Sequence, residues 1–229
     1  MTHCVFLSRR YRRVSAWLAG ARYVLIGALL CGLLAGCAII SKPPQLAAGI
    51  DDPAAWQARK QRLNELDTWS VQGRVATGQL LGWTGNLSWR QRGERFDVRL
   101  SAPLGAGGFY AYGTLDQVTI RTRERTFETA RPERLVRRIL GWQFPLQPLR
   151  FWAKGLPAPG DYQSISVDAQ GRLKRLQQHG WQLSYLKYTR VGEQPALPKR
   201  IVLDNGDTRI RLVVTRWFNL NGEHGASGN

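Results

Sequence analysis

The chain has 229 residues, a formal net charge of +17 and 43% hydrophobic residues, and this length suits one ordinary domain that buries a sizeable core. All three cysteines lie within the first 37 residues, which excludes a fold held together by disulfides and leaves stability to the core. The basic charge indicates nucleic acid, anionic lipid or an acidic protein as partner, or a solvated surface without a dedicated partner.

The first 36 residues are typical of a bacterial secretion signal. Five arginines, ending with Arg22, precede the apolar run Tyr23–Ala35, which is shorter than the ~20 residues of a transmembrane helix. The run leads into Leu34-Ala35-Gly36-Cys37, which resembles a bacterial lipobox. That resemblance implies that Cys37 begins the mature protein and carries a diacylglycerol and an N-acyl chain; we expect no other cofactor. Loss of residues 1–36 lowers the net charge to +12, and secretion excludes nucleic acid as a partner.

Residues 37–52 are predicted to form a flexible tether that carries the lipid. They contain Pro43-Pro44 and small residues without periodicity. In bacterial sorting rules an Asp after the acylated Cys retains a lipoprotein at the inner membrane, and this chain has Ala38 instead. We therefore expect an outer-membrane location, with the protein on the periplasmic face. The folded domain is expected at 53–218, followed by a disordered tail at 219–229.

A helix is predicted over 53–67, after which the hydrophobic pattern takes a period of two. Asp51 or Asp52 can cap the helix, and Pro53 suits its first turn. Asp204-Asn205-Gly206-Asp207 is typical of a hairpin turn. The alternation predicts antiparallel strands at 83–90, 95–100, 107–115, 117–123, 161–168, 172–179, from 181 onward, 200–203 and 208–217.

Two amphipathic helices are predicted in the middle of this series. The first runs from Pro132 to Leu140, and the second begins at Pro145 or Pro148. So many strands favour one curved antiparallel sheet or barrel, with the helices as a lid over its apolar face. An open barrel leaves an apolar cavity that could hold a lipid, although a fully packed core would use the same side chains. The alternation selects as candidate lining residues Trp83, Leu87, Trp89, Phe96, Val98 and Leu100.

A glycine-rich loop between two predicted strands carries one large apolar side chain. The loop contains Pro103-Leu104-Gly105. Leu104 on an exposed tip would suit insertion into a bilayer or into a groove of a partner. The alternative is that Leu104 folds back onto the rim of the barrel.

The sequence carries no motif that predicts catalysis or metal binding. It lacks the HExxH, CxxC and GxSxG patterns and the glycine-rich phosphate loops. His179, at the start of a predicted strand, is interpreted as structural. We therefore expect neither a metal site nor an enzyme.

The mature chain resembles the LolB family of outer-membrane lipoprotein receptors. The resemblance covers nearly all of 53–218 and depends on the order and spacing of short motifs behind the lipobox. These motifs are Gly73-Arg74-Val75 after Trp69, Leu87-Ser88-Trp89, Pro103-Leu104-Gly105, Gly141–Leu146, Leu149–Trp152 with Gly155-Leu156-Pro157, Gln178–Trp181, Leu197-Pro198 and Arg211–Trp217.

The resemblance implies an unclosed β-barrel of about eleven strands with a helical lid, akin to the periplasmic carrier LolA. It implies a monomer that accepts acylated lipoproteins from a LolA-type carrier into its cavity and inserts them into the outer membrane, without bond chemistry. Leu104 matches the exposed loop leucine that the family uses for targeting to outer-membrane phospholipid. A graded affinity is sufficient for such a one-way transfer.

Two other functions stay open at this point. A different lipid-binding lipoprotein of envelope assembly could use the same cavity, and the copurified ligand would distinguish the two. A lipid-degrading enzyme would need a nucleophile and a base, and persistent esterase activity would reveal it.

Overall fold

The computed structural model describes residues 49–78, 82–103, 108–114 and 116–222. They belong to one compact unit, Ala47–Asn229, and the chain's other unit is Met1–Leu46. The unit Ala47–Asn229 contains the whole described core, so we expect it to fold on its own. No helix among these described residues is long and apolar enough to cross a membrane. The predicted sites at Cys37, Leu104 and Gly105 lie outside the described residues.

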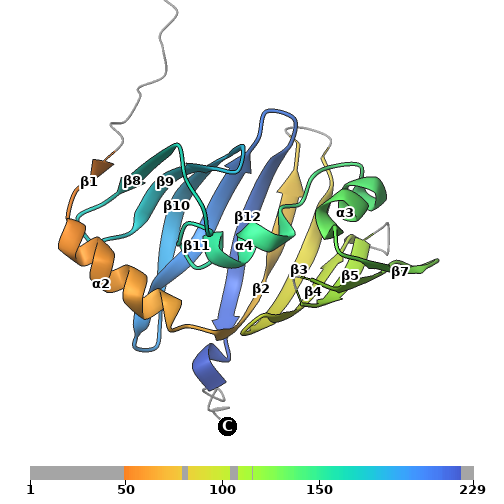
Figure 1. Cartoon of the computed structure of the whole chain (residues 1–229), viewed down its shortest axis with the longest axis horizontal. Coiled ribbons are helices and arrows are strands. Elements are labelled where there is room, and N and C mark those ends of the chain that lie inside the picture. Colours follow the sequence, from red (N-terminus) through yellow and green to blue (C-terminus); the bar gives the residue numbers. More distant parts are fainter. Residues whose placement is uncertain (1–48, 79–81, 104–107, 115, 223–229) are drawn as a thin grey trace, which may run out of the picture. The chain divides into compact units, whose positions relative to one another are not determined.

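In the part of the chain that the structure describes, one sheet of twelve strands forms the domain, in the order β1-β8-β9-β10-β11-β12-β2-β3-β4-β5-β6-β7 (Figure 1). All neighbours pair antiparallel except β1 and β8, which are parallel. The two ends of this order do not pair, so the sheet is unclosed, as predicted. The strands are β1 (Gly49–Ile50), β2 (Thr68–Thr77), β3 (Thr84–Arg92), β4 (Arg95–Ser101), β5 (Gly108–Gly113), β6 (Val118–Arg121), β7 (Thr126–Thr129), β8 (Ser164–Val167), β9 (Leu173–Gln178), β10 (Trp181–Val191), β11 (Gln194–Asp204) and β12 (Arg209–Phe218).

Among the described residues, three α-helices lie on one side of the sheet: α2 (Pro53–Asn64), α3 (Pro132–Leu140) and α4 (Leu146–Trp152) (Figure 1). All three were predicted from the sequence. Asp52 caps α2 by accepting the backbone N–H of Ala55 at 3.0 Å, and α3 ends at Gly141 with a left-handed φ of 76°. The start of α2 and the end of α3 therefore lie where their capping residues predict them.

The face of the sheet under the helices carries the core. On β3 every second residue is buried, and the other residues are exposed. Trp69 of β2 lies 5.5 Å from the rings of both Trp89 and Trp217, measured between ring centroids. The opposite face, which the helices do not cover, is called the bare face below.

The domain extends beyond the predicted limits of 53–218 at both ends. Gly49 and Ile50, within the predicted tether, pair with Ser166 and Val167 as strand β1. A short 3₁₀ turn, η2 (Leu220–Gly222), lies within the predicted tail. Leu220 is buried there, and the Asn221 side chain accepts the N–H of Asp67 and donates to the carbonyl of Glu65. Backbone pairing and buried apolar surface thus order segments whose composition alone indicates loops.

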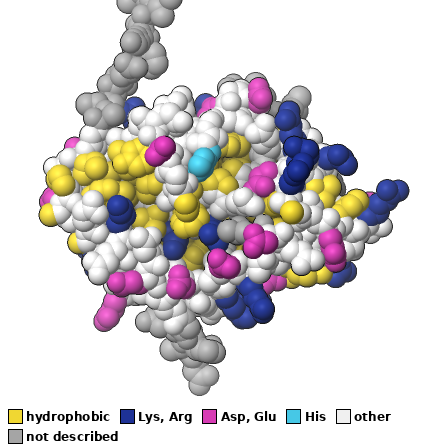
Figure 2. All heavy atoms as spheres, in the orientation of Figure 1, with side chains coloured by type: hydrophobic (Ala, Val, Ile, Leu, Met, Phe, Trp, Pro, Cys, Tyr) yellow, Lys and Arg dark blue, Asp and Glu magenta, His cyan; other side chains and the backbone are white. Residues whose placement is uncertain are grey.

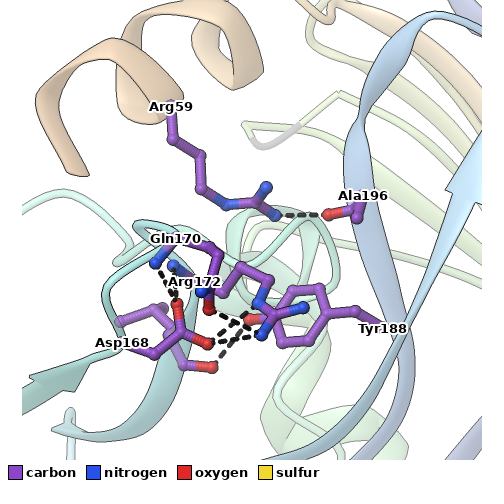
Figure 3. A network of polar contacts seen from close by, with 7 residues as sticks. Arg59, Asp168, Gln170, Arg172, Tyr188 and Ala196 are labelled. Atoms are coloured by element: carbon purple, nitrogen blue, oxygen red, sulfur yellow. Dashed lines mark hydrogen bonds and ion pairs between the residues drawn. The ribbon is translucent and has the colours of Figure 1, made fainter. Parts of the chain in front are cut away.

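Arg59 fastens α2 to the sheet (Figure 3). Its buried guanidinium donates to the carbonyl of Ala196 and lies 5.3 Å from the ring centre of Tyr188. The Tyr188 hydroxyl donates to the carbonyl of Leu173 at 2.8 Å, and Arg172 packs on the same ring. Burial lowers the pKa of Arg59. This network holds the N-terminal helix over β9, β10 and β11.

Candidate functional site

A cavity of about 630 Å³ lies between α3, α4 and the ends of β9 and β10. This volume falls in the range of small-molecule sites, about 300–1,000 Å³. Figure 2 shows hydrophobic side chains spread across this face of the molecule, with Lys and Arg side chains at several places between and around them. The lining residues are Glu133, Arg134, Arg137, Gln143, Phe144, Pro145, Gln147, Pro148, Arg150, Phe151, Ala158, Pro159, His179 and Trp181.

Helix α3 forms one wall of the cavity and packs on the domain through apolar side chains. Val136 is fully buried, and Leu135 and Ile139 are partly buried against the core. The carboxylate of Glu133 accepts the backbone N–H of Gln147 at 2.9 Å, so it joins α3 to the first turn of α4.

The linker between the two helices is held by the hairpin turn of β11 and β12. Asn205 Nδ2 donates to Gln143 Oε1 at 2.7 Å. Phe144 is buried and packs against Phe109 and Trp142, with ring centroids 6.2 and 5.9 Å apart. The predicted hairpin therefore fixes the segment that carries an aromatic wall of the cavity.

Gln178 fastens α4 and the following loop to the sheet. It is fully buried, and its Oε1 accepts the Trp152 indole N–H and the Ala158 backbone N–H, both at 2.9 Å. Its Nε2 donates to the Ala158 carbonyl at 2.8 Å. One amide thus positions the end of α4 and a lining residue of the cavity.

Lys154 joins the ends of α4 and α2. Its ammonium is buried and donates to the carbonyls of Leu63 and Leu66, each at 2.9 Å. Leu63 lies in the last turn of α2 and Leu66 lies just after it, where a cation is favourable. Burial nevertheless lowers the pKa of Lys154 to about 8.

Positive charge and a histidine lie at the edge of the cavity. The Arg150 guanidinium lies 4.5 Å from the ring centre of Phe151, and burial lowers the pKa of Arg150. His179 occupies a left-handed position with φ of 51° in the β9–β10 turn, and its ring packs on Trp152. The site therefore combines an apolar interior with basic groups on its wall, an arrangement suited to holding an apolar chain.

None of the six predicted lining residues is among the residues that line this cavity. Leu87, Trp89, Phe96, Val98 and Leu100 are buried on the helix-covered face of β3 and β4. The sixth predicted residue is only partly buried, and it contacts a residue that packs on the cavity wall.

That sixth residue is Trp83. Its ring lies 5.7 Å from Trp142, which in turn packs on Phe144 of the cavity wall. Of the predicted loop, Pro103 is exposed, and its neighbours Leu104 and Gly105 lie outside the described residues. The role of these residues stays a prediction.

Sequence reasoning assigned no site role to Gln178 or Lys154, because both are polar. One signal for Gln178 was available: it lies two residues after Leu176, on the apolar side of β9. For Lys154 the signal is its place in the apolar run Phe151–Leu156.

Comparison with known proteins places the chain among lipoproteins of the bacterial outer membrane. The family profile described as outer membrane lipoprotein LolB matches residues 67–217. An outer-membrane lipoprotein LolB from Nitrosococcus oceani is 41% identical over 188 residues, which cover 81% of this chain and 92% of that protein. A second one, from Stutzerimonas stutzeri, is 39% identical over 196 residues, covering 84% and 94%.

Among solved structures, a LolA superfamily protein from Nitrosomonas europaea is similar to this chain. Its TM-score is 0.46 at 11% identity, and the similarity covers 71% of this chain and 92% of that protein.

Proposed function

This chain belongs to the LolB family of outer-membrane lipoproteins, and on that premise we propose that it accepts acylated lipoproteins from a LolA-type periplasmic carrier and inserts them into the outer membrane. The cavity under α3 and α4 would receive the acyl chains of the cargo. The observation that carries the proposal is this cavity, which has an aromatic wall and lies next to a core of buried strand residues. Shielding of acyl chains from water is worth about 0.8 kcal/mol per CH₂ group, so an apolar container is needed.

A triacylated cargo needs more room than 630 Å³ provides, so we infer that the lid opens. Helix α4 is held by buried hydrogen bonds through Trp152, Lys154 and the carbonyl that accepts from Tyr185. Helix α3 packs mainly through Val136, Leu135 and Ile139. An acyl chain can replace apolar contacts, whereas buried hydrogen bonds would have to be broken. We therefore propose that α3 moves away and that the predicted residues on β3 and β4 then contact the cargo.

The remaining parts of the proposal concern the ends and the loop of the chain. Cys37 would carry the covalent lipids that anchor the protein to the periplasmic face of the outer membrane. Leu104, between Pro103 and Gly105, would enter the phospholipid leaflet during release of the cargo. The protein would act as a monomer and catalyse no reaction, since transfer follows from a difference in affinity between carrier, receptor and membrane.

A transfer assay tests this function. Soluble protein from residue 38 onward is mixed with LolA that has been loaded with a lipoprotein, and a pull-down identifies the new partner of the cargo. We expect the cargo to move onto this protein. Failure to move, with circular dichroism showing a folded domain, would refute the receptor function.

A pair of neighbouring substitutions makes the assay specific for the cavity. Arg137 lines the cavity, whereas the adjacent Arg138 is exposed and does not. Arg137→Trp should fill part of the cavity and slow acceptance of the cargo, while Arg138→Trp should leave it unchanged. Equal rates for the two variants would indicate that the acyl chains bind elsewhere.

A further inference from the structure

The bare face of the sheet carries a second hollow, which we call the arginine groove. It has a volume of about 370 Å³. In contrast to the cavity under the helices, its side chains are mainly hydroxyls, amides and two guanidinium groups, which favour a polar anion as ligand. Those that matter for the argument are Gln72, Arg74, Asn86, Ser88, Arg99 and Thr215.

The strand register places two arginines on either side of β3. Arg74 on β2 is the Cα partner of Asn86, and Arg99 on β4 is the Cα partner of Ser88. Because neighbouring strands are about 4.8 Å apart, the two backbones that carry the arginines are about 10 Å apart. Only short polar side chains of β3 lie between them, so both guanidinium groups can reach one ligand.

An irregular pairing shapes the floor of the groove. The register of β12 against β2 shifts between Val214 and Arg216, and the extra residue, Thr215, lines the groove. A Cβ atom at Gly73 would lie 2.5 Å from the carbonyl oxygen of Val213, so this close approach requires glycine. Bulges of this kind often redirect side chains at functional sites. The Gly73-Arg74 motif thus belongs to the construction of the groove.

The two guanidinium groups have no acidic partner within the described part of the chain. Neither takes part in the two ion pairs found there. The Arg99 guanidinium lies over the ring of Tyr110, 5.2 Å from the ring centre. The nearby carboxylate of Asp97 accepts a hydrogen bond from the Tyr110 hydroxyl. The stacking orients one guanidinium and leaves its N–H groups available.

The surroundings of the groove are basic as well. Further exposed arginines lie on the strands β3, β11 and β12: Arg90, Arg200, Arg209, Arg211 and Arg216. Of these, Arg209 is partly neutralised by Asp204, 3.6 Å away. A surface of this kind attracts an anionic membrane.

We propose that the arginine groove binds the phosphate of an anionic phospholipid headgroup, so that the bare face lies on the membrane. Guanidinium groups bind phosphate oxygens in a bidentate manner, and short hydroxyl and amide side chains can complete the contacts. An outer-membrane lipoprotein works beside a phospholipid leaflet, which supplies such phosphates. Docking through the bare face leaves the helix-covered cavity free to receive cargo.

Sedimentation with vesicles tests this proposal without any cargo, so its outcome is independent of the transfer function. The protein from residue 38 onward lacks Cys37 and therefore has no lipid anchor of its own. Vesicles of equal parts phosphatidylcholine and phosphatidylglycerol are compared with vesicles of pure phosphatidylcholine. We expect binding to the anionic vesicles only, and salt should weaken it.

Matched double variants identify the groove. Arg74→Gln with Arg99→Gln should weaken vesicle binding about 25-fold, since each basic group near an anionic membrane contributes about fivefold. Arg62→Gln with Arg190→Gln removes the same charge from exposed positions on α2 and β10 and should bind like the wild type. If the two variants lose vesicle binding equally, binding depends on the overall charge of the protein and not on the groove, and the proposal is overturned.

Two further experiments test whether the groove is a phosphate site on the membrane. Arg74→Lys with Arg99→Lys keeps the charge but not the bidentate geometry, so weaker binding than the wild type supports a phosphate site. Binding equal to the wild type contradicts it. If the glutamine variant still binds vesicles but no longer receives cargo from the carrier, the groove serves an acidic protein and the membrane assignment is wrong. Circular dichroism checks that these surface variants fold.

Discussion

Replacement of Gln178 by leucine is expected to destabilise the domain by about 1.5–6 kcal/mol. The substitution leaves three buried groups without a partner: the Trp152 indole N–H and the backbone N–H and carbonyl of Ala158. Each such group costs about 1–3 kcal/mol. The buried leucine side chain recovers about 1.5–3 kcal/mol of this loss.

Urea denaturation, followed by tryptophan fluorescence, measures the change. Gln177→Leu is the matched control, because Gln177 is the adjacent residue of β9 and points to solvent. We expect its free energy of unfolding to stay within about 0.5 kcal/mol of the wild type. If Gln178→Leu prevents folding, Gln178→Asn provides a milder test, since it keeps an uncharged amide at this position and shortens its reach by one methylene group. A loss no greater in Gln178→Leu than in Gln177→Leu would refute the idea that this amide holds α4 in place.

Three further predictions concern charge, the loop and the anchor. The pKa of Lys154, about 8 in the folded protein and 10.5 when unfolded, means that the unfolded chain binds more protons between these values. The free energy of unfolding should therefore rise with pH across that window by up to about 3 kcal/mol, relative to a Lys154→Met variant. The variant is titrated in parallel, because the tyrosines contribute equally to both curves and cancel in their difference. A difference between the two curves that stays constant with pH would contradict the prediction. Leu104→Glu should fold normally but impair release of cargo into membranes, and unchanged release would disprove the role of the loop. Cys37→Ala should abolish incorporation of labelled palmitate, and label that persists would exclude Cys37 as the lipidated residue.

The sequence predicted the helices and most strands, because their signals are local. Pro132 and Gly141 delimit α3, and the alternation of β3 follows directly from one buried face. Strand β2 was missed although it lies in the middle of the sheet. Its inner face contains Gly73 where a large apolar residue would be expected, and Ser70 and Thr77 are buried polar residues. Such a strand is specified by its neighbours on both sides rather than by its own pattern.

The walls of the cavity could not be predicted from the strands. Strand periodicity reports which face is apolar, and it led to Trp89 and Val98, which are buried in the core and do not line the cavity. The position of the cavity depends on how α3 and α4 lie over the sheet. That arrangement is set by contacts distant in sequence, such as Asn205 with Gln143 and Lys154 with Leu63.

The most direct test of the account is photocrosslinking of cargo from within the cavity. Benzoylphenylalanine replaces Phe151, which lines the cavity, or Leu186, which is 59% exposed on β10. After loading from LolA with a lipoprotein that carries labelled acyl chains, the probe at position 151 should crosslink to the acyl label and the probe at position 186 should not. Crosslinks from position 186 alone, with cargo bound, would contradict the claim that the acyl chains lie under the helices.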